Sequence, residues 1–109
     1  MSQFLTDLDT LKARGKMRIA YNNRFILLAW IDEKAYAIQD KCPHMGASLH
    51  PGRIDGEVVF CKDHNLGISL KTGEVVNQSQ ADHLRLDEYN RSVRTFPVII
   101  KDGKVFLDK

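Results

Sequence analysis

The chain has little of what marks secreted, disulfide-rich or membrane proteins. Its 109 residues include only 2 cysteines and 3 prolines, and two cysteines are too few for the disulfide framework of a small secreted domain. No apolar run reaches the roughly 18 residues that a membrane span needs. The N-terminal segment carries Asp7 and Asp9 where a secretory signal would have an apolar stretch. We therefore expect a cytoplasmic protein without a membrane span.

Charge of one sign is scarce too. The chain has 16 Lys and Arg residues against 14 Asp and Glu residues, so its formal net charge is only +2. No block of the sequence is basic enough to bind a phosphate backbone, which argues against nucleic acid as a partner. Hydrophobic residues make up 43% of the chain, enough for a compact core without disulfides. Length and composition predict a single domain over residues 1–109.

Long helical patterns are missing, and short strand patterns take their place. Residues 17–21 alternate between apolar and polar side chains, which indicates a strand with one buried face. Residues 24–31 are almost continuously apolar and predict a central strand, and residues 34–38 return beside it. Asn22-Asn23 and Asp32-Glu33 supply the turns between them. This part of the chain is therefore a predicted meander of hairpins.

The two ends of the chain continue this pattern. Residues 8–12 predict a short turn or a single helical turn. Asp102-Gly103 is a strong hairpin signal between residues 94–101 and 104–107. Pro97 lies inside the first of these two segments, so it marks a sheet edge or the start of a strand. With about nine short strands and no long helix, the sequence predicts an all-β domain.

Loop-forming residues interrupt the strands in the middle of the chain. Residues 40–53 contain two prolines and two glycines, which break regular structure. Residues 68–70 and 74–76 predict a further hairpin, and the polar stretch 77–84 a connection with a helical turn. Residues 40–76, approximately, therefore form a predicted subdomain inserted between two halves of a larger sheet.

Both cysteines and two of the histidines lie in that subdomain. They form a Cys42-x-His44 pair and, after sixteen further residues, a Cys61-x-x-His64 pair. Two unrelated thiols or one disulfide would explain the cysteines but not their pairing with histidines. Zinc and iron–sulfur clusters both accept thiolate and imidazole ligands. One Cys and one His in each loop favours a two-iron cluster, with the thiolates on one iron and the imidazoles on the other.

At this point the sequence resembles the Rieske iron–sulfur proteins. Residues 42–49 read CPHMGASL and match the family's Cys-Pro-His-x-Gly-x-x-Leu loop. Cys61-x-x-His64, followed by Leu70-x-Thr72-Gly73, is similar to the family's second cluster loop and the turn after it. The resemblance implies a Rieske-type antiparallel β-sandwich with a small cluster-binding subdomain of two loops. It also implies one 2Fe–2S cluster, bound by Cys42, His44, Cys61 and His64.

The second loop departs from the family pattern at three positions that are not ligands. Lys62 stands where the family usually has Pro, Asn65 where it usually has Gly, and Ile68 where Phe is common. Asn is the non-glycine residue that most readily adopts the left-handed conformation. We therefore expect Asn65 to keep the loop geometry that Gly provides.

The cluster chemistry implied by this resemblance is one-electron transfer. Two sulfides and two protein ligands fill the tetrahedral shell of each iron, so we expect no catalysis by this chain alone. High-potential members carry a disulfide between their loops, which two ligating cysteines cannot provide. Those members also have Ser and Tyr hydroxyls near the cluster, where Leu66 and Ile68 stand here. The residues predict a low-potential centre, at about −150 to 0 mV.

The resemblance also suggests partners. Rieske-type ferredoxins take electrons from a flavin reductase and pass them to an oxygenase. An alternative is a small subunit fixed in a larger reductase, as in assimilatory nitrite reductases, and a less favoured one is a zinc-stabilised interaction module. We expect Pro43, Met45, Lys62 and Leu66 to form a docking rim around the histidines. The other two histidines, His50 and His83, are expected to be surface residues and not ligands.

Overall fold

The computed structural model describes residues 2–44, 46–87 and 91–108, which form short antiparallel strands and two short helices. In chain order the elements are β1 (Ser2–Asp7), α1 (Leu8–Arg14), β2 (Lys16–Tyr21), β3 (Arg24–Ile31), β4 (Lys34–Gln39), β5 (Arg53–Asp55), β6 (Val58–Phe60), β7 (Gly67–Ser69), α2 (Gln78–His83), β8 (Thr95–Phe96), β9 (Val98–Lys101) and β10 (Lys104–Asp108). Neither helix in this part of the chain is long and apolar enough to cross a membrane.

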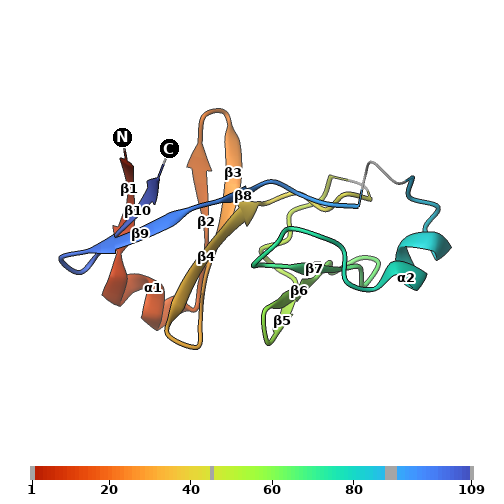
Figure 1. Ribbon diagram of the computed structural model, residues 1–109, viewed down its shortest axis with the longest axis horizontal. Helices are drawn as coiled ribbons and strands as arrows, with labels where there is room; N and C mark the ends of the chain where they lie inside the picture. The colour runs from red at the N-terminus through yellow and green to blue at the C-terminus, as the bar shows by residue number, and fades with distance from the viewer. Residues whose placement is uncertain (1, 45, 88–90, 109) are drawn as a thin grey trace.

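The strands form three antiparallel sheets. One sheet has the order β1-β10-β9, a second β2-β3-β4-β8, and the third β5-β6-β7. Figure 1 shows both chain ends beside the first sheet, with the third sheet and α2 at the opposite end of the molecule. The expected all-β fold is confirmed, and the third sheet lies inside the stretch 40–76 for which we expected a subdomain.

Strand β3 lies at the centre of the fold because both of its faces are buried. Leu27 and Ala29 face one apolar cluster, while Ile26 and Leu28 face the other. Strand β2 pairs with β3 along its full length but is only half-buried, on one face. This difference is what the continuous apolar pattern of residues 24–31 and the alternating pattern of 17–21 predict.

The turns predicted from the sequence are present. Asn22 and Asn23 both have positive φ, at 48° and 62°, and join β2 to β3. Asp102 and Gly103 have φ of 53° and 72° and join β9 to β10. Positive φ at both central positions is the backbone of the tight hairpin turn that suits twisted strands.

Pro97 divides a segment that we predicted as one strand. Residues 94–101 form β8, which pairs with β4, and β9, which pairs with β10 in another sheet. Proline has no N–H for a ladder bond, while the Pro97 carbonyl accepts a hydrogen bond from the Asp108 amide at 2.9 Å. Both strands lie at sheet edges, as the proline indicated.

Two other expectations need correction. The segment predicted as residues 8–12 is a helix over Leu8–Arg14, with Leu11 buried and Gly15 at its C-terminal end. The predicted strand 74–76 forms only isolated bridges, between Ile68 and Val75 and between Glu74 and Ser92. Backbone hydrogen bonds from the Ser69 amide to the Glu74 carbonyl and from the Val76 amide to the Gly67 carbonyl, both at 2.9 Å, still hold this segment beside β7.

Candidate metal centre

The two Cys/His loops present both thiols to one apolar core. Cys42 follows β4 and Cys61 follows β6, and their exposed fractions are 1% and 2%. Both belong to the cluster of buried residues that also contains Leu49 and Leu66. Neither cysteine is in a disulfide. Both thiols are therefore shielded from water in the core that the two loops share.

The backbones of the two loops repeat the same hydrogen-bonded frame. In the first loop the Cys42 amide donates to the Ala47 carbonyl, and the Gly46 amide donates to the Cys42 carbonyl. In the second loop the Cys61 amide donates to the Leu66 carbonyl, and the Asn65 amide donates to the Cys61 carbonyl. The four N···O distances are between 2.7 and 2.8 Å. Each frame thus holds a cysteine at its start and leaves the next residues free to turn.

Corresponding positions in the two frames are left-handed. Gly46 and Asn65 each lie four residues after their cysteine, with φ of 74° and 56°. Glycine adopts this conformation without strain, and asparagine is the best tolerated of the other residues. The expectation that Asn65 takes over the role of glycine is confirmed.

The two histidine rings lie against each other between the loops. The ring centroids of His44 and His64 are 4.4 Å apart with an interplanar angle of 82°, and both side chains are half-buried. His44 Nδ1 is a buried polar atom that has no hydrogen-bond partner among the described residues. Such an atom is costly unless something binds it, so this donor set of two thiols and two imidazoles fits a 2Fe–2S cluster.

No three Cys, His, Asp or Glu side chains in the described part of the chain are grouped as ligands of one metal ion. A structural zinc site needs four such ligands around a single centre. A cluster with two thiolates on one iron and two imidazoles on the other needs only two protein ligands at each metal.

Asp40 anchors the first loop, a role that sequence reasoning missed. Its side chain is 0% exposed and accepts four hydrogen bonds. The donors are Arg18 Nε at 2.7 Å, Ser48 Oγ at 2.5 Å, and the amides of Leu49 and His50, both at 2.8 Å. Charge-assisted bonds of this kind are stronger than neutral ones. The far end of the cluster loop is therefore tied to β2 and β4 through one carboxylate.

Gly52 allows the same loop to approach β6. A Cβ atom at this position would lie 2.1 Å from the Phe60 carbonyl oxygen and 3.0 Å from that of Leu49. Both contacts are with backbone atoms, which cannot move aside as a flexible side chain can. Only glycine fits, and the end of the first loop is thereby held next to the strand that leads into the second.

Helix α2 and the residue before it hold the second loop. Asn77 Oδ1 accepts from the Gly67 amide at 2.9 Å, and Asn77 Nδ2 donates to the Asn65 carbonyl at 3.0 Å. Gln80 Nε2 donates to the carbonyl of His64 at 2.6 Å. Side chains of α2 thus contact the backbone of a ligand candidate. In the sequence these residues are only part of a polar connection.

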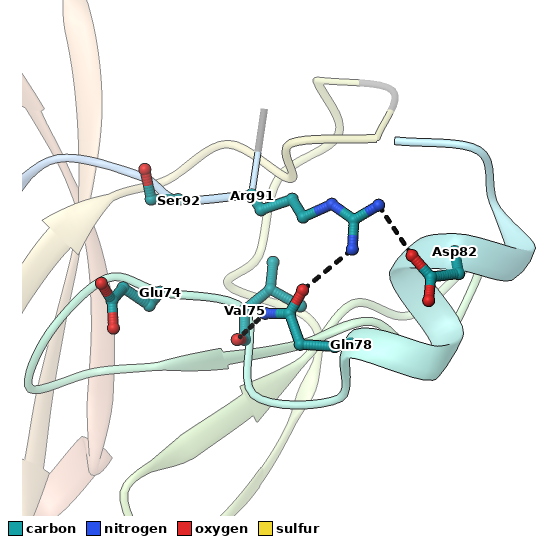
Figure 2. A pocket seen from close by; sticks show the side chains of 6 residues that line it. All are labelled: Glu74, Val75, Gln78, Asp82, Arg91 and Ser92. Carbon is teal, nitrogen blue, oxygen red and sulfur yellow. Dashed lines mark hydrogen bonds and ion pairs between the residues drawn. The ribbon is translucent and has the colours of Figure 1, made fainter. Parts of the chain in front are cut away.

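Arg91 in turn fixes α2, as Figure 2 shows. Its guanidinium donates to Gln78 Oε1 at 2.9 Å and forms an ion pair with Asp82 at 2.8 Å. A further bond runs from Arg91 Nη2 to the Leu86 carbonyl at 2.6 Å. The cleft formed by these side chains is lined by both acidic and basic groups. Its cation is already paired, so we interpret the cleft as a brace for α2.

Replacing Gln80 by alanine should loosen the second loop. The His64 carbonyl loses a short hydrogen bond, so we expect the free energy of unfolding to fall by about 1 kcal/mol and the bound iron to be released faster. Urea unfolding and iron release to a chelator measure the two effects. Ser79→Ala, on the exposed side of the same helix, is the control. Equal effects of both substitutions would contradict a specific role for Gln80.

The expected docking residues differ in their exposure to solvent. Pro43 is half-buried and Lys62 exposed, while Met45 lies outside the described residues. Leu66 is 0% exposed, so its assignment to the docking rim was wrong. Its carbonyl closes the hydrogen-bonded frame of the second loop and its side chain packs into the core beneath the thiols. Leu66 is therefore a core-packing residue of the second loop.

The remaining histidines lie outside the pair formed by His44 and His64. His83 is exposed at the end of α2, which agrees with the expected surface position. His50 is half-buried and lines a shallow hollow with Arg14 and Arg18. Its backbone amide, and not its ring, contributes to the loop through Asp40.

Comparison with known proteins identifies the family. The family model described as "Rieske [2Fe-2S] domain" matches residues 3–97. The chain is 28% identical over 109 residues to the 3-phenylpropionate/cinnamic acid dioxygenase ferredoxin subunit of Photorhabdus laumondii, a match that covers 98% of this chain and 94% of that protein.

Solved structures show the same fold. The ferredoxin of carbazole 1,9a-dioxygenase from Nocardioides aromaticivorans IC177 superposes with a TM-score of 0.81 at 18% identity, covering 98% of this chain and 96% of that one. A putative nitrite reductase NADPH small subunit gives 0.78 at 24% identity, covering 100% and 99%. The chain spans only 33% of NdmA from Pseudomonas putida CBB5, which it covers with a TM-score of 0.81 at 16% identity.

The family match covers most of the chain and includes both Cys/His loops. The family therefore implies one 2Fe–2S cluster in this chain and not a zinc ion. With two buried thiols, two adjacent imidazoles and two matching loop frames at the end of an antiparallel fold, the chain belongs to the Rieske 2Fe–2S family.

Proposed function

We propose that this protein is a low-potential one-electron carrier whose cluster is held by Cys42 and Cys61 on one iron and His44 and His64 on the other. The observation that carries the proposal is the pairing of two buried thiols with two half-buried imidazoles on loops of equal frame. When bound, a 2Fe–2S cluster supplies a centre that gains and loses one electron.

The chain's own residues fix this centre and limit its chemistry. The hydrogen bonds to Asp40 and to Asn77 and Gln80 hold the two loops from opposite sides. Rigid ligands reduce the reorganisation that accompanies each electron transfer. Because two sulfides and two protein groups complete the shell of each iron, we propose that the chain does not transform a substrate alone and acts as the electron-transfer component of an oxidoreductase system.

For the partner, we propose an oxygenase as electron acceptor and a flavin reductase as donor. The similar protein from Photorhabdus laumondii is named a dioxygenase ferredoxin subunit, and a related solved structure is a complex of an oxygenase with its ferredoxin. Pro43 and Lys62, at the surface of the two loops, would contact such a partner. We place the carrier in the cytoplasm, where its ligating thiols would stay reduced during cluster assembly.

A second candidate is a small subunit fixed in a larger reductase. It is favoured by the similarity to the putative nitrite reductase small subunit, which the chain matches over nearly its whole length. The two functions differ in stoichiometry. One preparation of the carrier should support many turnovers of a separate oxygenase, whereas a fixed subunit should co-purify with a larger chain at a constant ratio.

Iron and acid-labile sulfide analysis with a redox titration tests the proposal. We expect two irons and two sulfides per chain and a midpoint potential of about −150 to 0 mV, because Leu66 and Ile68 give no hydroxyl donor to the cluster. Both side chains are 0% exposed and apolar. A midpoint above about +150 mV would contradict the low-potential assignment, and zinc without sulfide would contradict the cluster.

A further inference from the structure

A strip of basic side chains runs along the molecule to the first cluster loop. These side chains line two shallow hollows, and Arg18 lines both of them. The five cations of the strip are Arg14, Lys16, Arg18, Arg24 and Lys41. We refer to these five residues, together with Phe25, as the basic strip. A chain with a formal net charge of only +2 thus concentrates positive charge in one place.

The pleat of β2 explains how the strip meets the loop. Lys16 and Arg18 alternate with Met17 and Ile19, which pack into the core below β1 and β10. The two cations therefore face the side where the cluster loops lie. Lys16 Nζ donates to the Gly52 carbonyl at 2.6 Å. The strip is attached to the end of the first loop by this bond.

The strip adjoins the proposed cluster ligands, and among the described residues Arg18 is its only cation in an ion pair, with Asp40. Gly46, whose amide bonds to the Cys42 carbonyl, lines the same hollow as Arg24 and Lys41. Among the described residues, Asp40 is the only carboxylate in the lining of either hollow, and its side chain is 0% exposed. Neither Arg24 nor Lys41 forms an ion pair within the described residues. The outward charge is therefore positive.

An aromatic ring lies in the middle of these cations. Phe25 is 42% exposed, and the Arg18 guanidinium lies 3.7 Å from its ring centroid. Arginine and aromatic side chains are among the residues most enriched where proteins contact one another.

We propose that the basic strip is a docking surface for an acidic face of the protein redox partner. Binding at the strip would place that partner next to the first cluster loop. The proposal rests on the electron-carrier function and specifies the chemistry of its partner. Complementary charge steers association and fixes orientation more than it raises affinity. The occupant is a protein surface rich in Asp and Glu, with an apolar contact for Phe25.

The test compares two variants with the same change in charge. Arg24→Glu/Lys41→Glu reverses two cations of the strip. Lys101→Glu/Lys104→Glu reverses two exposed cations on the β9–β10 hairpin, at the far end of a molecule 44 Å long (Figure 1). That hairpin also exposes Ile99 and Ile100, so it matches the strip in character. In about 0.1 M salt, charge acts over only about 10 Å, so the hairpin is screened from the cluster loops.

The first measurement is oxidation of the dithionite-reduced holoprotein by ferricyanide, which takes one electron and becomes ferrocyanide. In about 0.1 M salt we expect the second-order rate constant of the strip variant to fall about tenfold, and that of the hairpin variant to change less than about twofold. With the cationic oxidant tris(phenanthroline)cobalt(III) the strip variant should react faster than wild type. Equal effects of the two variants would overturn the proposal.

The second measurement is retention of each holoprotein on immobilised poly-L-glutamate. Wild type and the hairpin variant should be retained to higher salt than the strip variant. Retention on duplex DNA to the same salt concentration as on poly-L-glutamate would assign the strip to nucleic acid and overturn the proposal. A wild-type protein that dithionite cannot reduce would show instead that the electron-carrier function itself is wrong, before any comparison of variants.

Discussion

Cys61→Ala should yield a folded, colourless protein without iron or sulfide. Cys61 lies in the core at 2% exposure, and its backbone closes the frame of the second loop through bonds that alanine keeps. The substitution therefore removes the thiolate while leaving the loop intact, and an iron with three remaining ligands loses the cluster. Iron and sulfide analysis measures the loss, and the far-ultraviolet circular dichroism spectrum shows whether the fold persists.

The histidines provide the matched series for this experiment. His44→Ala and His64→Ala should each lower the iron content by at least about tenfold, because the rings that lie 4.4 Å apart would share one iron. His50→Ala and His83→Ala should retain two irons per chain, since neither ring is part of that pair. Comparable iron loss in all four variants would show that the ligand assignment is wrong.

Asp40→Ala should cost about 3 kcal/mol of unfolding free energy, the second largest effect that we expect. The substitution leaves the buried Leu49 amide without its acceptor, and the part-buried His50 amide with only a 3.3 Å bond to Ser48 Oγ. It also separates Arg18 from its counter-ion. Unfolding of the holoprotein in urea measures the loss, and the first cluster loop should lose protection from hydrogen exchange before the rest of the fold.

Two controls distinguish this anchor from an ordinary surface charge. Asp55 pairs with Arg53 at 3.6 Å with 76% of its side chain exposed, so Asp55→Ala should change stability by less than about 1 kcal/mol. Asp40→Asn keeps one acceptor oxygen for the two amides and should recover part of the loss. If Asp40→Ala were no more destabilising than Asp55→Ala, the carboxylate would not be what holds the loop.

Local patterns were enough to predict most of the fold. The apolar run 24–31 became β3 because its burial on both faces leaves no room for alternation. The asparagine pair at 22–23 and Asp102-Gly103 became tight turns because those residues tolerate positive φ. The split at Pro97 was harder to predict, since a proline shows where a ladder bond is missing but not that the flanking residues join different sheets.

The Cys and His ligand candidates could also be predicted from the sequence, but the residues that hold their loops in place could not. Cysteine and histidine at fixed spacing are rare enough to stand out. Asp40 looks like any polar residue at a strand end, and its role depends on amides that lie nine and ten residues further along. Asn77, Gln80 and Arg91 act only when α2 folds back over the second loop. Such contacts depend on tertiary structure, which spacing does not encode.

The pairing of β1 with β10 has a practical consequence. Ser2 and Asp108 are partners in this ladder, so both ends of the chain emerge together, away from the cluster loops (Figure 1). A tether at either end therefore orients the molecule in the same way. Immobilised on an electrode through a linker at one end, the protein would present its redox-active tip to the solution. In a fusion with a reductase or an oxygenase, the linker would leave the molecule from the same region whether the partner precedes or follows this domain.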